Sequence, residues 1–141
     1  MLVGARELAF DIDADDMRLR HDGRPWGADD FEHLGLHVSP DLDTVMYTLA
    51  GLANPDTGWG LAGDTFRAME MVGRYGGPEW FNLGDLDLGT SLVRTALLRE
   101  GHPLSAVTGQ LSRALGIQHP ILPMSDDPVR TWLDTDQVAL P

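Results

Sequence analysis

Four carboxylates gather around the start of one predicted helix. Asp29 and Asp30 precede the helix, and Asp41 and Asp43 lie in its first turn. Side chains two positions apart on a helix diverge by about 200°, so we expect one of Asp41 and Asp43 to face the helix N-terminus and the other to face a pocket. Such oxygen ligands suit Mg²⁺, which takes one or two carboxylates together with water and substrate phosphate. Helix capping beside a solvated acidic loop is the alternative that the spacing leaves open.

The helix that positions these carboxylates is the best-defined element in the sequence. Ser39 and Pro40 open it, because Ser is a favoured N-cap and Pro a favoured first helical residue, and Gly51 closes it. Its apolar side chains recur at the spacing of one buried face, at Leu42, Val45, Met46, Leu49 and Leu52. This helix therefore fixes the direction in which Asp43 points.

Three further helices are predicted downstream. Asp64 is a candidate cap for a helix over residues 64–75, and Asp87 for a third helix that runs to about residue 99, with Leu88, Leu92, Ala96 and Arg99 at helical spacing. A fourth covers residues 105–115. Short strands are predicted near residues 8–12, 117–124 and 131–133, while residues 11–24 are either a solvated hairpin or disordered. Strong helices with few strands indicate a piece of a larger α/β domain.

Three other aspartates are candidates for substrate contacts. Asp85 lies in the loop before the third helix, and Asp126 and Asp127 follow an apolar stretch, in the kind of loop where α/β proteins place ligands. A turn role is equally open for the last two. His33 and His37 are four apart but lie in a Gly-broken segment rather than a helix, so we predict no histidine-based metal site.

Aromatic side chains also lie in the Gly-rich loops. Trp59, Trp80 and Phe81 either stack on a planar ligand or anchor their loops. The helical arginines, Arg67, Arg74, Arg94 and Arg99, are expected to form ion pairs with neighbouring acids.

The overall charge limits the possible partners. The chain has 141 residues and a formal net charge of −12, from 22 acidic and 10 basic residues. A field of that sign repels nucleic acid and anionic membrane, so we expect neither as a partner. Phosphate groups would have to be met by a metal ion, by helix N-termini or by a few arginines. The absence of cysteine excludes disulfides, thiolate metal sites and cysteine catalysis, and it fits a cytoplasmic location.

Five blocks, which together cover roughly residues 28–131, resemble the 2-phospho-L-lactate transferase family of coenzyme F-420 biosynthesis. In chain order they read DDFEHLGLHVSPDLDTVMYTLAG, GWGLAGDTFRAME, WFNLGDLDL, LLREGHPLSAVT and ILPMSDDPVRT. The first and last blocks are specific to this family rather than generic motifs.

The resemblance implies a reaction, a fold and a site. Such enzymes transfer a phospholactyl or phosphoenolpyruvyl group from a guanosine-diphosphate-linked donor to the deazaflavin alcohol 7,8-didemethyl-8-hydroxy-5-deazariboflavin. GMP is released and Mg²⁺ is required. The implied fold is a Rossmann-like parallel sheet with flanking helices. By motif match Asp43 is the key catalytic, metal-binding and deazaflavin-binding residue, Asp29 or Asp30 supplies a second metal carboxylate, and Asn82 falls where the family places a deazaflavin contact.

The chain also departs from the family pattern. The family's Gly-rich phosphate loop is absent, the match fails just upstream of Asp29, and Leu86 and Ser91 stand where the family has Arg and His. We therefore expect an incomplete fragment, with a poorly matched segment over residues 1–27 and a partial transferase domain over residues 28–141, and a homo-oligomer is possible. The alternatives are a nucleotide-sugar-binding module of the gluconeogenesis-factor type and an inactive fragment that associates with other chains.

Overall fold

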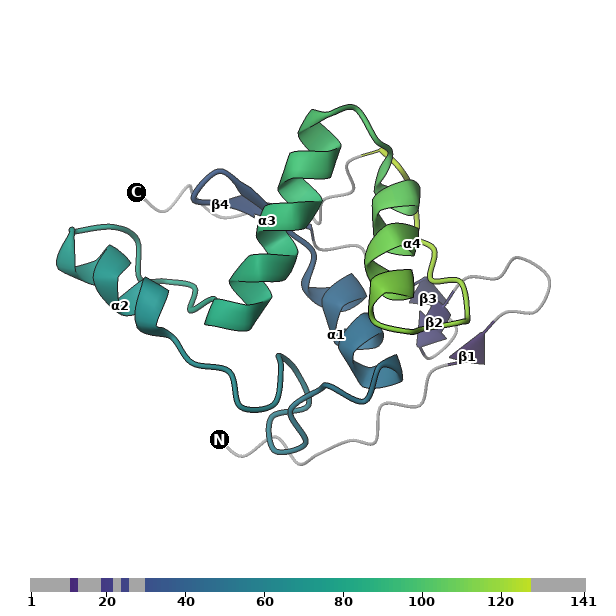
Figure 1. Ribbon diagram of the computed structural model, residues 1–141, viewed down its shortest axis with the longest axis horizontal. Helices are drawn as coiled ribbons and strands as arrows, with labels where there is room; N and C mark the ends of the chain where they lie inside the picture. The colour runs from purple at the N-terminus through teal and green to yellow at the C-terminus, as the bar shows by residue number, and fades with distance from the viewer. Residues whose placement is uncertain (1–10, 13–18, 22–23, 26–29, 128–141) are drawn as a thin grey trace, which may run out of the picture.

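The computed structural model describes residues 11–12, 19–21, 24–25 and 30–127, and Figure 1 shows how their helices and strands are arranged. Three short antiparallel strands come first, in the order β1 (Asp11–Ile12), β2 (Leu19–His21) and β3 (Arg24–Pro25). Within residues 11–24 the described strands pair antiparallel, which agrees with the hairpin alternative. The strand predicted at residues 131–133 lies outside the described residues.

A second antiparallel pair leads directly into the first helix. It consists of β4 (Phe31–His33) and β5 (Leu36–Val38), with Phe31 opposite Val38. Leu34 and Gly35 form the turn, and both have positive φ, of 53° and 76°. Two central residues with positive φ are the signature of a tight hairpin turn. The hairpin fixes where the chain enters the helix that carries Asp43.

Helix α1 (Pro40–Leu49) lies at the centre of the hydrophobic core and confirms the helix predicted there. Leu42, Val45 and Met46 are buried, as their spacing predicts, whereas Leu49 and Leu52 at the far end are each 41% exposed. The core is completed by Tyr47 and by residues from α4 (Leu104–Ala114) and the loop after it, which are Leu104, Ile117 and Ile121.

The strand pairs in the described part of the chain are all antiparallel, so the expected parallel sheet is not seen there. The physical reason at β4 and β5 is the two-residue connection, since parallel strands need a crossover of a dozen or more residues. The prediction of a strand over residues 117–124 was wrong. Pro120 and Pro123 lack the N–H groups that a strand would use, and Ile117 and Ile121 pack into the core from an irregular segment instead.

The N-termini of helices α2 (Arg67–Arg74) and α3 (Asp85–Arg99) are each capped by an aspartate that belongs to the start of the other helix, an arrangement we call crosswise caps. The carboxylate of Asp64 accepts the N–H groups of Leu86 and Asp87 at 2.8 and 3.3 Å, at the start of α3. The carboxylate of Asp85 accepts the N–H groups of Arg67 and Ala68 at 3.1 and 2.9 Å, at the start of α2. The predicted caps, Asp64 for the second helix and Asp87 for the third, were therefore wrong.

No helix in the described part of the chain has the length and apolar character needed to cross a membrane.

Candidate functional site

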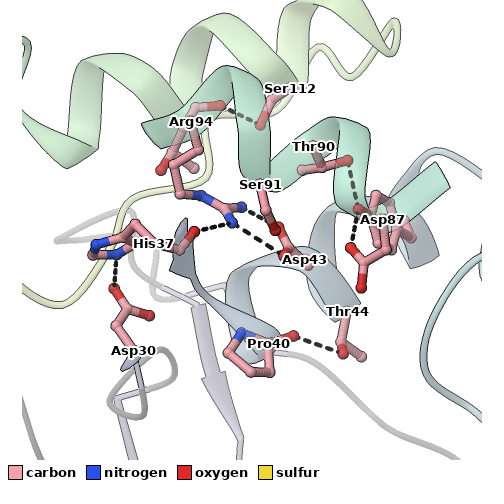
Figure 2. Close-up of polar contacts among 12 residues, drawn as sticks. Asp30, His37, Pro40, Asp43, Thr44, Asp87, Thr90, Ser91, Arg94 and Ser112 are labelled. Carbon is pink, nitrogen blue, oxygen red and sulfur yellow. Dashed lines mark hydrogen bonds and ion pairs between the residues drawn. The ribbon is translucent and has the colours of Figure 1, made fainter. Parts of the chain in front are cut away.

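The predicted key residue, Asp43, faces inward from α1 and pairs with Arg94 of α3 (Figure 2). Both Asp43 oxygens accept hydrogen bonds from the guanidinium group, and the bond from Arg94 Nη1 to Asp43 Oδ2 measures 3.2 Å. Arg94 Nη1 also donates to the carbonyl oxygen of His37 in β5, at 3.4 Å. Arg94 therefore ties α1, α3 and β5 together around one carboxylate.

Burial dominates the electrostatics of Asp43. Its side chain is 5% exposed and that of Arg94 is 2% exposed. Burial raises the pKa of Asp43 from 3.8 to about 6, even though the nearby charge of Arg94 opposes this change. The charges of Asp87 and Asp30 add to the increase. Two further carboxylates therefore lie close enough to Asp43 to influence its protonation.

Asp87 is the second carboxylate at this site, and it comes from α3. The Tyr47 hydroxyl lies 2.6 Å from both Asp87 Oδ1 and Thr90 Oγ1. Burial raises the pKa of Asp87, and the hydrogen bond from Tyr47 opposes the change. Asp87 is the third residue of α3, inside the helix, so it is not the N-cap that the sequence indicated. Its side chain lines the candidate site instead.

A cavity of about 240 Å³ lies between these two carboxylates and a group of aromatic side chains. Its walls combine acidic, aromatic and amide groups, contributed by Asp43, Tyr47, Trp59, Phe81, Asn82 and Asp87. Phe81 packs against two other aromatic rings. Its ring centroid lies 5.1 Å from that of Phe31 and 5.7 Å from that of Trp80. The cavity can accept a flat ligand whose polar groups meet carboxylate or amide.

Other candidates from the sequence lie in different surroundings. Asp85 caps α2, and its pKa is lowered because the Thr65 hydroxyl and the Ala68 N–H donate to it. Asp126 accepts hydrogen bonds from the N–H and hydroxyl of Ser105, at 2.7 and 3.0 Å, at the start of α4. The exposed Asp127 donates its N–H to the hydroxyl of Ser125. None of these three aspartates is among the described residues that line the cavity.

Asp30 is the remaining described carboxylate from the acidic loop, and Asp29 lies outside the described residues. Asp30 Oδ2 is 3.0 Å from His37 Nε2, while Asp30 Oδ1 is buried without a hydrogen-bond partner (Figure 2). Within residues 30–127 and the three short strands before them, no three acidic or histidine side chains cluster as a metal site would require. Asp30 thus offers one free oxygen, and Asp43 is already compensated by a cation.

Reasoning from the sequence missed Tyr47 and the inward position of Asp87. A signal for Tyr47 was present, because it follows Asp43 by four residues and therefore shares its helical face. The expected ion pairing of Arg94 is confirmed, with Asp43 as its partner. That partner lies 51 residues away in the sequence and could not be identified from local spacing.

Comparison with known proteins gives one consistent result. Residues 27–139 match the model of the family described as 2-phospho-L-lactate transferase CofD. A phosphoenolpyruvate transferase of Streptomyces avermitilis is 50% identical over 109 residues, which are 77% of this chain and 34% of that protein. A relative with the same name from Thermobifida fusca is 49% identical over 73% of this chain and 32% of its own length. Another, from Mycobacterium avium, is 49% identical over 69% of this chain and 29% of its own length. The chain spans about a third of the length of these curated relatives.

Proposed function

The chain belongs to the 2-phospho-L-lactate transferase CofD family, and from this premise we propose that it carries the acceptor-binding part of a transferase of coenzyme F-420 biosynthesis. The proposed reaction moves a phosphoenolpyruvyl or phospholactyl group from a guanosine-diphosphate-linked donor to 7,8-didemethyl-8-hydroxy-5-deazariboflavin. A phosphorus–oxygen bond forms to the acceptor hydroxyl, the bond to GMP breaks, and the hydroxyl proton is released. Because the relatives are named phosphoenolpyruvate transferases, we favour the phosphoenolpyruvyl donor.

The observation that carries this proposal is the cavity with aromatic and acidic walls. A deazaflavin is a flat, aromatic ring system with a polar edge and a hydroxylated side chain. Trp59 and Phe81 offer faces or edges for ring stacking, which favours offset or edge-on contacts. Asn82 lines the same cavity and can donate to and accept from the polar edge of the ring.

Asp43 and Arg94 would orient the acceptor hydroxyl. A carboxylate has about four lone-pair positions, so Asp43 can accept the hydroxyl proton in a hydrogen bond while it remains paired with Arg94. Arg94 is itself held by the carbonyl oxygen of His37, which limits the movement of the pair. Phosphoryl-type transfer depends mainly on positioning and charge stabilisation, and this arrangement provides positioning.

The expected Mg²⁺ fits the described residues in part. Mg²⁺ takes one or two carboxylates from a protein. Asp30 has a free buried oxygen, whereas both Asp43 oxygens already accept hydrogen bonds from Arg94, and no three acidic or histidine side chains in the described part of the chain cluster as a metal site. We propose that Asp30 and Asp43 hold the ion, with Asp29 as a further candidate. When bound, Mg²⁺ would neutralise the donor diphosphate within an acidic protein. The Rossmann-like parallel sheet, likewise, is proposed for the complete fold of the family.

Two measurements test the proposal. The first is GMP release from each guanosine-linked donor in the presence of the deazaflavin alcohol and Mg²⁺, with Asp43→Asn as the variant. We expect faster release with the phosphoenolpyruvyl donor and at least a tenfold slower rate for Asp43→Asn. If GMP is released and Asp43→Asn leaves the rate unchanged, the assignment of Asp43 is wrong.

The second measurement is direct binding of the deazaflavin alcohol, followed by its fluorescence. Trp59→Ala should weaken binding about fivefold, because loss of an aromatic contact costs about 1 kcal/mol. Tyr75→Ala is the matched control, since Tyr75 is 83% exposed and is not among the residues lining the cavity. A wild-type chain that neither binds the deazaflavin nor releases GMP would contradict the proposed function.

A further inference from the structure

Helix α3 has an apolar face that points away from the described part of the molecule. Leu86, Leu92 and Val93 are 56%, 51% and 46% exposed, and Gly89 and Ala96 beside them are also exposed. At about 100° per residue these five positions span an arc of about 120°. Single exposed apolar residues are common, but a continuous apolar stripe along a helix usually marks a contact surface. We call these five residues the outer face of α3.

The opposite side of α3 is buried and largely polar, although Leu98 near its end packs against the hydrophobic core. Ser91, Arg94 and Thr95 are each at most 6% exposed, and Asp87 lies on the same side at the cavity wall. In Figure 1 this helix crosses the middle of the view, with α1 and α4 beside it. An ordinary surface helix has the reverse arrangement, with apolar residues toward the core and polar residues toward water. The polar side of α3 therefore faces the candidate site, and its apolar side lacks a partner among the described residues.

We propose that the outer face of α3 is covered by the part of the family polypeptide that has no counterpart in this chain. The comparisons supply the occupant, because about two thirds of each relative lies outside the match. On this view α3 separates the candidate site from the main hydrophobic core of the longer fold. The inference rests on the family membership used for the proposed function, but not on the reaction.

The composition of the outer face supports a tightly packed interface. Gly89 and Ala96 are small and lie within one turn of the larger Val93, so another element can approach the helix closely between them. No charged residue interrupts the face between Leu86 and Ala96. Asp85 and Arg99 mark its two ends, as expected for a buried patch with a polar rim.

Thiol labelling tests the inference, because the chain contains no cysteine of its own. Val93→Cys would be made in the isolated chain and in a hybrid in which this chain replaces the matching segment of the Streptomyces avermitilis relative, with the cysteines of that relative replaced by serine. We expect maleimide to react with the introduced thiol at least tenfold more slowly in the hybrid. Gln110→Cys, on an exposed polar part of α4, is the matched control and should react at similar rates in both.

A second variant gives an independent measurement. Val93→Glu should leave the urea midpoint of the isolated chain unchanged and lower that of the hybrid, because only the hybrid would bury the new charge. If the hybrid does not unfold cooperatively, the same two substitutions at the aligned position of the intact relative provide the comparison.

Two outcomes would overturn the inference. One is equally fast labelling of Val93→Cys in the isolated chain and in the hybrid or intact relative. The other is slow labelling in the isolated chain that speeds up on dilution together with a dimeric mass, which would assign the face to a second copy. Neither measurement needs the deazaflavin or the donor. A protected thiol without GMP release would therefore reject the proposed function alone.

Discussion

Asp43 and Arg94 form a buried ion pair at the wall of the cavity. Removing two charges from water is costly, and their mutual attraction compensates only when the geometry and the remaining hydrogen bonds are good. Arg94 meets this condition in part: its Nη groups bond the two Asp43 oxygens and the carbonyl oxygen of His37, whereas its buried Nε has no hydrogen-bond partner. We therefore expect that removing either partner, which leaves the other buried without its counter-charge, strongly lowers the stability of the fold.

A double-mutant cycle measures this dependence. Asp43→Asn and Arg94→Met should each lower the free energy of unfolding by about 3–5 kcal/mol, because each leaves one charged or polar partner buried without compensation. The double variant should lose clearly less than the sum of the two. Urea unfolding provides the values, with Glu100→Gln as a surface control expected to change stability by less than about 0.5 kcal/mol. Additive losses would show that the two side chains do not stabilise each other.

At the scale of elements, the crosswise caps join α2 to α3. Asp64 lies just before α2 and caps α3, while Asp85 is the first residue of α3 and caps α2, so the two helix N-termini depend on each other. Asp87, at the cavity, directly follows the capped end of α3. The geometry of the candidate site is therefore linked to these caps.

Gly84 is required by this arrangement. A Cβ at position 84 would collide with the carboxylate of Asp64, so Gly84→Ala should displace the cap of α3. We expect Gly84→Ala and Asp64→Ala each to cost about 1 kcal/mol in free energy of unfolding. Because both remove the same cap, the double variant should cost little more than either single variant. A double loss equal to the sum would contradict the shared cause.

The lowered pKa of Asp85 predicts how this cap depends on pH. A carboxyl group with a lower pKa in the folded state stabilises the protein above its unfolded pKa, near 3.8, and this contribution disappears as the pH falls through the folded value. Asp85→Asn should therefore have a lower urea midpoint than wild type at pH 7. The difference should shrink as the pH is lowered below about 4. Asp56→Asn, at an exposed loop position, serves as the control. A difference that persists unchanged at acidic pH would exclude the carboxylate as the cause.

At the scale of the whole molecule, two kinds of interior meet at α1. One side packs against α4 and the following loop in an apolar core, and the other side carries the ion pair and the cavity toward α3. The outer face of α3 remains exposed. Apolar burial in the described chain is thus concentrated around one helix.

A matched pair of truncations tests this distribution. Met46→Ala should lower the free energy of unfolding by about 2–5 kcal/mol, because Met46 is 2% exposed in the core. Leu92→Ala on the outer face of α3 should change it by less than about 0.5 kcal/mol in the isolated chain. Similar losses for both would place Leu92 in a packed interior and contradict this description.

Local patterns in the sequence were sufficient for part of this structure. Pro40 at the first helical position and the spacing of Leu42, Val45 and Met46 identified α1, since both signals act within a few residues. Ser39 takes the N-cap position as predicted, but its side chain makes no capping hydrogen bond. The family-specific blocks identified the family, which the comparisons confirm. They also singled out Asp43 and Asn82, both of which line the cavity. Their roles in metal and substrate binding stay predictions.

Only the tertiary structure decided how the acidic residues are divided between capping and the cavity. Asp85 and Asp87 are two residues apart, yet one caps α2 and the other lines the cavity. The sequence assigned the caps to the nearest helices because local spacing cannot show which helix end lies across a loop. The pairing of Asp43 with Arg94 likewise joins residues that are 51 positions apart. Such choices depend on desolvation and on which groups meet after packing, and these are properties of the folded chain as a whole.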